Sequence, residues 1–156
     1  MPLAQMELRI PSLWDLLPKV REEVSRHLSG LPDDVRDDAV MAVSELVENA
    51  IKYARPGPSG DAAALSIECS PKALRLTVSS MVRSPEAARS TVERVRVIQQ
   101  APSRFALYLN RLHQLAEAPT ASAQLGLFRI ASEGEFELDC LLQDDTLHIT
   151  ATRELS

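Results

Sequence analysis

A long helix-forming segment, bounded on both sides by residues that break helices, constrains the fold of this chain more than any other feature. Pro32 precedes a cluster of carboxylates, which the positive end of a helix dipole favours in the first turns. These carboxylates are Asp33, Asp34, Asp37 and Asp38. The sequence Arg-Pro-Gly-Pro-Ser-Gly at 55–60 prevents the helix from continuing. We therefore predict a helix over residues 33–54, whose broad apolar face must be covered by a sheet or by further helices.

The remaining segments alternate between strand and helix patterns. Pro18 predicts a kink or a restart inside the first helix, and Pro102 divides a long helical region into two helices. Predicted strands occupy residues 4–11, 64–69, 73–79, 135–142 and 146–152, and the other predicted helices occupy residues 12–28, 85–118 and 125–132. This order predicts an α+β fold, a two-layer sandwich in which helices cover one face of a mixed or antiparallel sheet. With 156 residues and no repeat, we expect one domain over residues 1–156.

Composition narrows the classes of partner. The net charge of −5 argues against nucleic acid and against an anionic membrane, because both require a concentrated positive surface. No apolar run approaches the roughly 20 residues that span a bilayer, and the first residues do not resemble a signal peptide. We therefore expect a cytoplasmic protein. Cys69 and Cys140 lie in apolar runs, which favours buried free thiols over a disulfide.

Three polar side chains fall on one face of the predicted helix at 33–54. At about 100° per residue, Glu45, Asn49 and Lys52 lie within a stripe of about 60°. An amide oxygen is a hard ligand for Mg²⁺, an ammonium is a point charge for phosphate, and a carboxylate can deprotonate a water or a hydroxyl. The stripe is therefore a candidate site for magnesium triphosphate, although the same residue types are common on an ordinary solvated helix face.

The sequence around this stripe resembles a known motif. Glu45-x-x-x-Asn49-Ala50-x-Lys52-Tyr53-Ala54 resembles the N box of the GHKL (Bergerat-fold) ATPases, which include histidine-kinase catalytic domains and anti-sigma-factor serine kinases. Leu125-Gly126-Leu127 resembles the opening of that family's late glycine-rich helix. The resemblance implies that Asn49 is the magnesium ligand, that Glu45 is the catalytic base, and that Lys52 contacts phosphate. Ser80 and Gly126 are the further candidate nucleotide-binding residues.

Within the superfamily, the chain is most similar to the SiaB-type protein kinases, in its length, its two-helix insert at 85–118 and its ending. That resemblance implies a bacterial signal-transduction regulator that uses ATP and Mg²⁺ to phosphorylate a small partner protein. A homodimer is also open, because the apolar patch at residues 13–17 of the first predicted helix indicates either core packing or a partner or dimer surface. The insert is rich in arginine, which indicates either solvated helix faces or a surface for an acidic or phosphorylated partner. These residues are Arg83, Arg89, Arg94, Arg96 and Arg104.

Two nucleotide motifs of the superfamily are eroded here. The Asp-x-Gly-x-Gly box expected after the second hairpin strand is replaced by residues 78–85, which contain neither Asp nor Gly. Ser79 or Ser80 could accept the hydrogen bond from adenine, but a neutral hydroxyl is a weaker acceptor than a carboxylate. The late phosphate-binding turn, residues 121–126, retains a single glycine and has Gln124 where glycine is expected.

Two functions remain open on these observations. The first is a protein kinase of the SiaB or anti-sigma-factor type that binds Mg·ATP weakly and phosphorylates or sequesters a partner. The alternative is a pseudokinase-type module on the same fold, which binds its partner without nucleotide. The stripe on the helix favours the first, and the eroded motifs favour the second.

Overall fold

The computed structural model describes residues 4–11, 14–55, 61–117 and 125–155. The strands are β1 (Ala4–Pro11), β2 (Ala54–Arg55), β3 (Asp61–Cys69), β4 (Ala73–Val82), β5 (Glu137–Gln143) and β6 (Thr146–Glu154). The helices are α1 (Leu17–His27), α2 (Asp33–Tyr53), α3 (Pro85–Gln100), α4 (Arg104–Glu117) and α5 (Leu125–Ser132), and a 3₁₀ turn at Trp14–Leu16 precedes α1.

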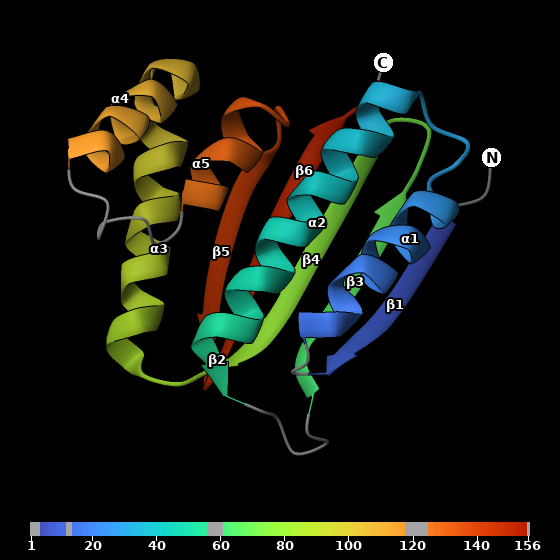
Figure 1. Ribbon diagram of the computed structural model, residues 1–156, viewed down its shortest axis with the longest axis horizontal. Coiled ribbons are helices and arrows are strands. Elements are labelled where there is room, and N and C mark those ends of the chain that lie inside the picture. Colours follow the sequence, from blue (N-terminus) through green and yellow to red (C-terminus); the bar gives the residue numbers. More distant parts are fainter. Residues whose placement is uncertain (1–3, 12–13, 56–60, 118–124, 156) are drawn as a thin grey trace.

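The strands form one sheet in the order β1-β3-β4-β6-β5, with β2 paired to the end of β4. Each described strand pair is antiparallel. The helices lie on one face of this sheet, with α1 over its β1 side, α2 over β3 and β4 at its middle, and α3 and α5 over its β5 side (Figure 1). The predicted α+β sandwich with helices on one face is therefore confirmed, and the sheet is antiparallel rather than mixed.

The predicted elements appear close to their expected places. Pro18 lies in the first turn of α1, directly after the 3₁₀ turn, so the helix restarts there because proline has no amide hydrogen to donate. The break near Pro102 separates α3 from α4. Strand β4 runs three residues beyond its predicted end at 79, because β2 and β6 continue to pair with it. The predicted loop at 119–123 lies outside the described residues.

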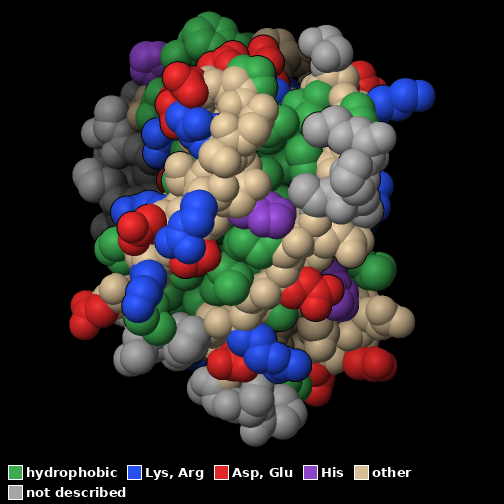
Figure 2. All heavy atoms as spheres, turned by 90° about the vertical axis from the view of Figure 1, so that its right-hand side faces the viewer, with side chains coloured by type: hydrophobic (Ala, Val, Ile, Leu, Met, Phe, Trp, Pro, Cys, Tyr) green, Lys and Arg blue, Asp and Glu red, His purple; other side chains and the backbone are tan. Residues whose placement is uncertain are grey.

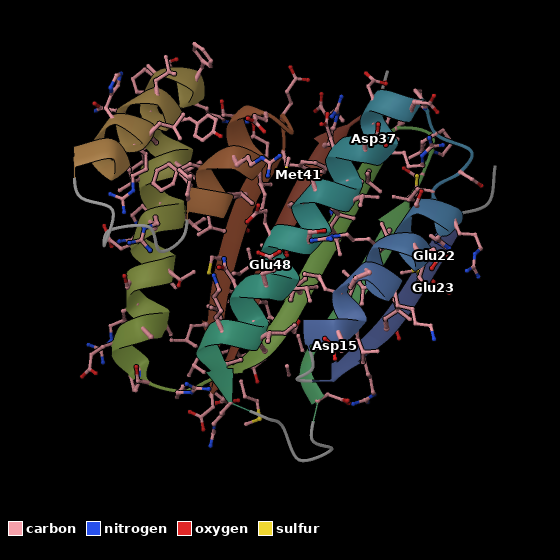
Figure 3. All side chains as sticks on the ribbon, in the orientation of Figure 1. Asp15, Glu22, Glu23, Asp37, Met41 and Glu48 are labelled. Carbon is pink, nitrogen blue, oxygen red and sulfur yellow. The ribbon has the colours of Figure 1, made fainter. Side chains whose placement is uncertain are left out.

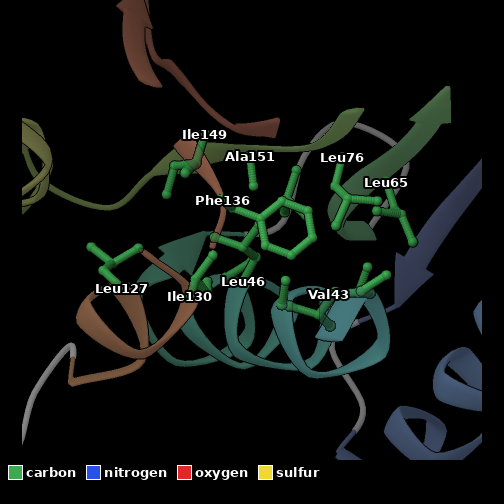
Figure 4. Packing of buried hydrophobic residues seen from close by; sticks show 14 of the residues in the cluster. Val43, Leu46, Leu65, Leu76, Leu127, Ile130, Phe136, Ile149 and Ala151 are labelled. Atoms are coloured by element: carbon green, nitrogen blue, oxygen red, sulfur yellow. The ribbon is translucent and has the colours of Figure 1, made fainter. Parts of the chain in front are cut away.

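The core lies between α2, α5 and the sheet (Figure 4). Val43 and Leu46 of α2 face Leu76 of β4 and Ala151 of β6, and all four side chains have exposed fractions of zero. Phe136 enters this layer from the connection between α5 and β5 and is also fully buried. An aromatic ring of this size makes the connection after α5 part of the core rather than a surface loop.

The turn between α5 and Phe136 is tightly packed at Gly134. A Cβ atom on Gly134 would lie 2.7 Å from the carbonyl oxygen of Ile130 and 2.8 Å from the Phe136 ring. Glu135 takes a left-handed backbone conformation, with φ of 57°. Glycine at 134 is therefore required by close packing, because a methyl group would overlap backbone that cannot easily move.

The outer sides of α1 and α2 are polar. Asp15 lies in the turn before α1, Glu22 and Glu23 lie along α1, and Asp37 and Glu48 lie along α2 (Figure 3). On the side that presents β1 and α1, acidic and basic side chains are interspersed (Figure 2). Among the described helices, none is long and apolar enough to cross a bilayer.

Cys69 and Cys140 are both free thiols, as predicted, but they are half-buried rather than buried. They lie on β3 and β5, which are separated by β4 and β6. Strands are spaced about 4.8 Å apart, so the two residues are well beyond the roughly 7 Å within which a disulfide can form. Burial, with a smaller contribution from Asp139, raises the pKa of the Cys140 thiol to about 11.

Candidate functional site

A cavity of about 250 Å³ opens between the C-terminal half of α2, the end of β4 and α3. Asn49 of α2 and Ser80 of β4 both line it. Its walls are otherwise largely apolar, with Leu46 and Ala50 on one side and Ile149 on another. The cavity thus combines an apolar slot with an amide and a hydroxyl, the composition typical of a small-molecule site.

The sequence left open whether Ser79 or Ser80 would serve this site, and strand geometry separates them. Successive side chains of a strand point to opposite faces of the sheet. Ser79 lies 2.7 Å from Nδ1 of His148 through its hydroxyl oxygen, on the face away from the helices. Ser80 lines the cavity, so Ser80 is the hydroxyl available to a ligand there.

Helix α3 and the residues before it contribute side chains that the sequence did not predict for this site. Thr91, Arg94 and Arg83 all line the cavity. Thr91 is buried and donates its hydroxyl hydrogen to the carbonyl of Ala87, and Arg83 donates to the carbonyl of Ala54 at 3.1 Å. For these arginines the sequence predicts solvated helix faces or a partner surface. The packing of α3 against β5 and β4 brings Thr91 and Arg94 to the cavity, and no short sequence motif predicts this packing.

Glu45 lies one turn before Asn49 on α2 and faces α5 instead of lining this cavity. Its carboxylate Oε1 accepts a hydrogen bond from Nη1 of Arg129 at 3.3 Å. A Cβ atom on Gly126 would overlap this carboxylate, with the Glu45 Cδ atom only 2.9 Å away. The missing side chain at Gly126 thus makes space for the Glu45 carboxylate in this structure.

The surroundings of Glu45 disfavour its ionised form. Burial is the largest cause that raises the pKa of this carboxyl group, and the charge of Glu48 raises it further. Arg129 and Lys52 act in the opposite direction without cancelling the effect. A carboxyl group with a raised pKa holds a proton closer to neutral pH, which is the property that general acid–base chemistry uses.

Lys52 is exposed and is not part of the cavity lining, although its charge acts on Glu45. The three side chains of the predicted stripe therefore point in three different directions. Asn49 faces the cavity, Glu45 packs against α5, and Lys52 extends outward. Residues 121–124 of the thinned glycine turn, including Gln124, lie outside the described residues, whereas Gly126 lies in the first turn of α5.

The described residues fit parts of a magnesium nucleotide. The apolar walls suit the faces of a purine base, and the Asn49 amide is an oxygen donor of the kind that Mg²⁺ prefers. Against this, none of the described lining residues is a carboxylate, and the volume lies below the roughly 300–1,000 Å³ of typical ligand pockets. The fit is therefore partial, because Asn49 is the single described oxygen donor of the cavity that matches a predicted metal ligand.

A second and larger cavity, of about 490 Å³, lies at the opposite end of α2. Its lining includes His27, Ser70 and Leu155. It contains none of the residues that the sequence predicted for a nucleotide site, so size alone does not identify the functional site.

Comparisons with solved structures agree with this architecture. A chain of the SiaB–SiaC complex from Pseudomonas aeruginosa is similar at a TM-score of 0.67 and 16% identity, covering 96% of this chain and 89% of that one. The structure of the RsbU and RsbW domains from Mycobacterium tuberculosis is similar at a TM-score of 0.52 and 14% identity. That match covers 99% of this chain, which spans 33% of the other. At these identities the likeness concerns the fold.

At the level of sequence, no curated protein matches this chain significantly. The model of the histidine kinase-like ATPase domain, however, matches residues 10–132, from the end of β1 to the end of α5. That span contains α2 with Glu45 and Asn49, the cavity wall of β4, and the Leu125-Gly126-Leu127 opening of α5. The chain therefore belongs to the histidine kinase-like ATPase domain family.

Proposed function

We propose that this chain is a bacterial signal-transduction regulator that binds Mg·ATP weakly and phosphorylates or sequesters a partner protein. The observation that carries the proposal is the placement of Asn49 and Ser80 on two walls of one cavity, with Glu45 a helical turn from Asn49. The amide oxygen is a hard donor of the kind that Mg²⁺ prefers, and a carboxyl group with a raised pKa suits a general base.

Each residue has a role in this proposal. Asn49 offers its amide oxygen to magnesium, Ser80 accepts a hydrogen bond from the adenine, and Lys52, outside the cavity lining, offers its charge to phosphates that extend out of the cavity. Glu45 takes the proton from the attacking hydroxyl of the partner protein. When bound, magnesium would supply charge neutralisation for the phosphates.

The same geometry accounts for weak binding. Ser80 is a neutral acceptor where the superfamily uses an aspartate, and the space beside Gly126 is filled by the Glu45 carboxylate. Each lost hydrogen bond to a charged group costs about 1.5–3 kcal/mol. Losing two would weaken binding by roughly a hundredfold or more, so we expect a dissociation constant well above that of an intact site.

A calorimetric titration with Mg·ATP and Mg·ADP tests nucleotide binding. We expect saturable heat for the wild type and a large loss for Asn49→Ala, because that change removes the metal ligand. Asn110→Ala is the matched control, since Asn110 is exposed on α4 and away from the cavity. The absence of heat from a folded wild-type sample at millimolar nucleotide would end the proposal.

Transfer of labelled γ-phosphate to a protein of a bacterial lysate tests the catalytic part. We expect labelling that requires magnesium and that is lost in both Asn49→Ala and Glu45→Gln. Labelling that persists in Glu45→Gln would remove Glu45 from the role of base.

The two free thiols fit a cytoplasmic site of action, because reducing compartments keep thiols unpaired.

A second candidate function is partner binding without nucleotide, and the surface of α4 favours it. Phe105, Leu109 and Leu112 recur at helical spacing and are 64%, 41% and 38% exposed. An apolar stripe of this kind on one helix face is typical of a protein–protein contact. This function predicts that Asn49→Ala leaves partner binding intact while Phe105→Ala weakens it.

The two candidate functions give opposite results with the same two variants. If nucleotide governs the partner, Asn49→Ala disrupts the complex. If α4 alone governs it, Phe105→Ala does so. Sedimentation equilibrium of the isolated chain then shows whether the stripe instead joins two copies in a homodimer.

A further inference from the structure

Arg129 of α5 contacts carboxylates on two sides. Its Nη1 atom donates to Oε1 of Glu45 at 3.3 Å, and its Nε atom donates to Oε2 of Glu133 at 2.7 Å. The hydroxyl of Tyr108 on α4 donates to the other oxygen of Glu133 at 3.2 Å. A continuous chain of polar contacts therefore runs from α4 through α5 to Glu45 on α2.

Two features of α5 fix the place of the Glu45 carboxylate. Gly126 and Arg129 are three residues apart, so they lie on the same face of the helix. Gly126 leaves the space that the carboxylate fills, and Arg129 supplies the donor that binds it. The position of the Glu45 carboxylate is therefore set by Gly126 and Arg129 of α5.

This contact differs from an ordinary surface ion pair. The side chains of Glu45 and Arg129 are 24% and 44% exposed, whereas those of Glu93 and Arg96, paired on α3 at 3.0 Å, are 64% and 55% exposed, so the main difference lies in the carboxylate. Exposed pairs are screened by water and often contribute little. Because water has less access to the Glu45 carboxylate, the position of this group depends more on its hydrogen bond from Arg129.

We propose that Arg129 is a positioning residue for Glu45, and that Glu133 and Tyr108 anchor its guanidinium to α4. This inference rests on the function proposed above, in which Glu45 is the base. A planar guanidinium that is fixed by one carboxylate presents its remaining N–H groups in a defined direction. Arg129 thereby sets where the Glu45 oxygens lie, without itself touching the nucleotide or the partner.

A test independent of activity uses a double-mutant cycle of Glu45→Gln and Arg129→Met, read as urea midpoints. We expect Arg129→Met to lower the midpoint more in the wild-type background than in the Glu45→Gln background. Arg96→Met is the control, and it should shift the midpoint equally in both. An equal shift for Arg129→Met in both backgrounds would overturn the positioning role.

Kinetics of the phosphotransfer reaction give the second test. We expect Arg129→Met to lower kcat by about tenfold or more while the KM for ATP stays within about twofold, because a misplaced base slows the chemical step and leaves nucleotide binding intact. Arg129→Lys should restore part of kcat. The kcat of Tyr108→Phe should lie between that of the wild type and that of Arg129→Met.

The outcomes separate the two proposals. A rise in the KM for ATP as large as the fall in kcat would make Arg129 a ligand-binding residue and overturn the inference. A wild type that neither binds Mg·ATP nor transfers phosphate would end the proposed function, whereas the urea cycle would still decide whether Arg129 holds Glu45 in place.

Discussion

The two ends of α5 each depend on a glycine, and the reasons differ. At the start, Gly126 faces the tip of a carboxylate side chain, whereas beyond the end Gly134 faces the Ile130 backbone and the ring of Phe136. Both sites lack room for a Cβ atom. At Gly126, however, the obstacle is a flexible and charged group from another helix, and at Gly134 it is the fully buried core.

This difference separates a site that can rearrange from one that cannot. The core end is held by close packing, in which even one methyl group is felt. The site end is held by a carboxylate whose ionised form burial disfavours, so its charge is less stable there than it would be in water. Functional groups of proteins are often kept in such unfavourable settings, because the fold as a whole supports them.

The largest expected effect belongs to the core end. Phe136→Ala should lower the free energy of unfolding by about 3–5 kcal/mol, because it removes a fully buried ring. Phe105→Ala is the control of the same chemistry, since Phe105 is 64% exposed, and it should change stability by no more than about 0.5 kcal/mol. Urea denaturation measures both, and similar losses would contradict the placement of Phe136.

A smaller loss is expected from Gly134→Ala. The added methyl group overlaps backbone and the Phe136 ring, and overpacking of this kind costs about 1–3 kcal/mol. The loss should persist when Glu45 is also replaced by alanine, because the two sites do not touch. A neutral Gly134→Ala variant in thermal unfolding would show that the turn adapts.

Gly126→Ala should instead depend on Glu45. Alanine favours a helix over glycine by about 0.5–1 kcal/mol, but here the methyl group must displace the carboxylate. We expect little or no net gain in the wild-type background and the full gain in the Glu45→Ala background. The same gain in both backgrounds, measured by urea denaturation, would separate Gly126 from Glu45.

The smallest effect concerns the charge of Glu45 and has a defined sign. A carboxyl group whose folded-state pKa is raised stabilises the fold below its unfolded pKa of about 4.3, and this stability is lost as pH rises through the folded value. Glu45→Gln should therefore stabilise the protein by less than about 1 kcal/mol at pH 7, with a smaller difference at pH 4.

Thermal unfolding at the two pH values measures this difference. Glu22→Gln, on the outward side of α1 (Figure 3), is the exposed control and should stay within about 0.5 kcal/mol at pH 7. A Glu45→Gln variant that is less stable than the wild type at neutral pH would show that the pair with Arg129 outweighs the cost of burial.

Much of the fold could be predicted because its signals are local. The carboxylates before α2, the breaker after it, and the prolines at 18 and 102 each act within a few residues of their own position. The alternation of Leu74, Leu76 and Val78 likewise predicts one buried face of β4, and all three are buried.

The site was less predictable because its contacts join distant segments. The spacing of Glu45 and Asn49 on one helix could be derived, but their division between α5 and the cavity could not. Arg129 lies 84 residues from Glu45, and its pairing depends on how α5 packs against α2. The sequence predicts a nucleotide-binding role for Gly126, since no local pattern indicates that a carboxylate occupies the space of its missing side chain.

The most direct test of the central claim is the location of nucleotide on the molecule. Titration of isotope-labelled protein with Mg·ADP, followed by amide NMR, should shift the side-chain amide of Asn49 and the backbone amides of Ser80 and Thr91. Asn49→Ala should abolish the shifts at Ser80 and Thr91. Shifts confined to the second cavity, at Ser70 and Leu155, or no shifts at millimolar nucleotide, would contradict the account.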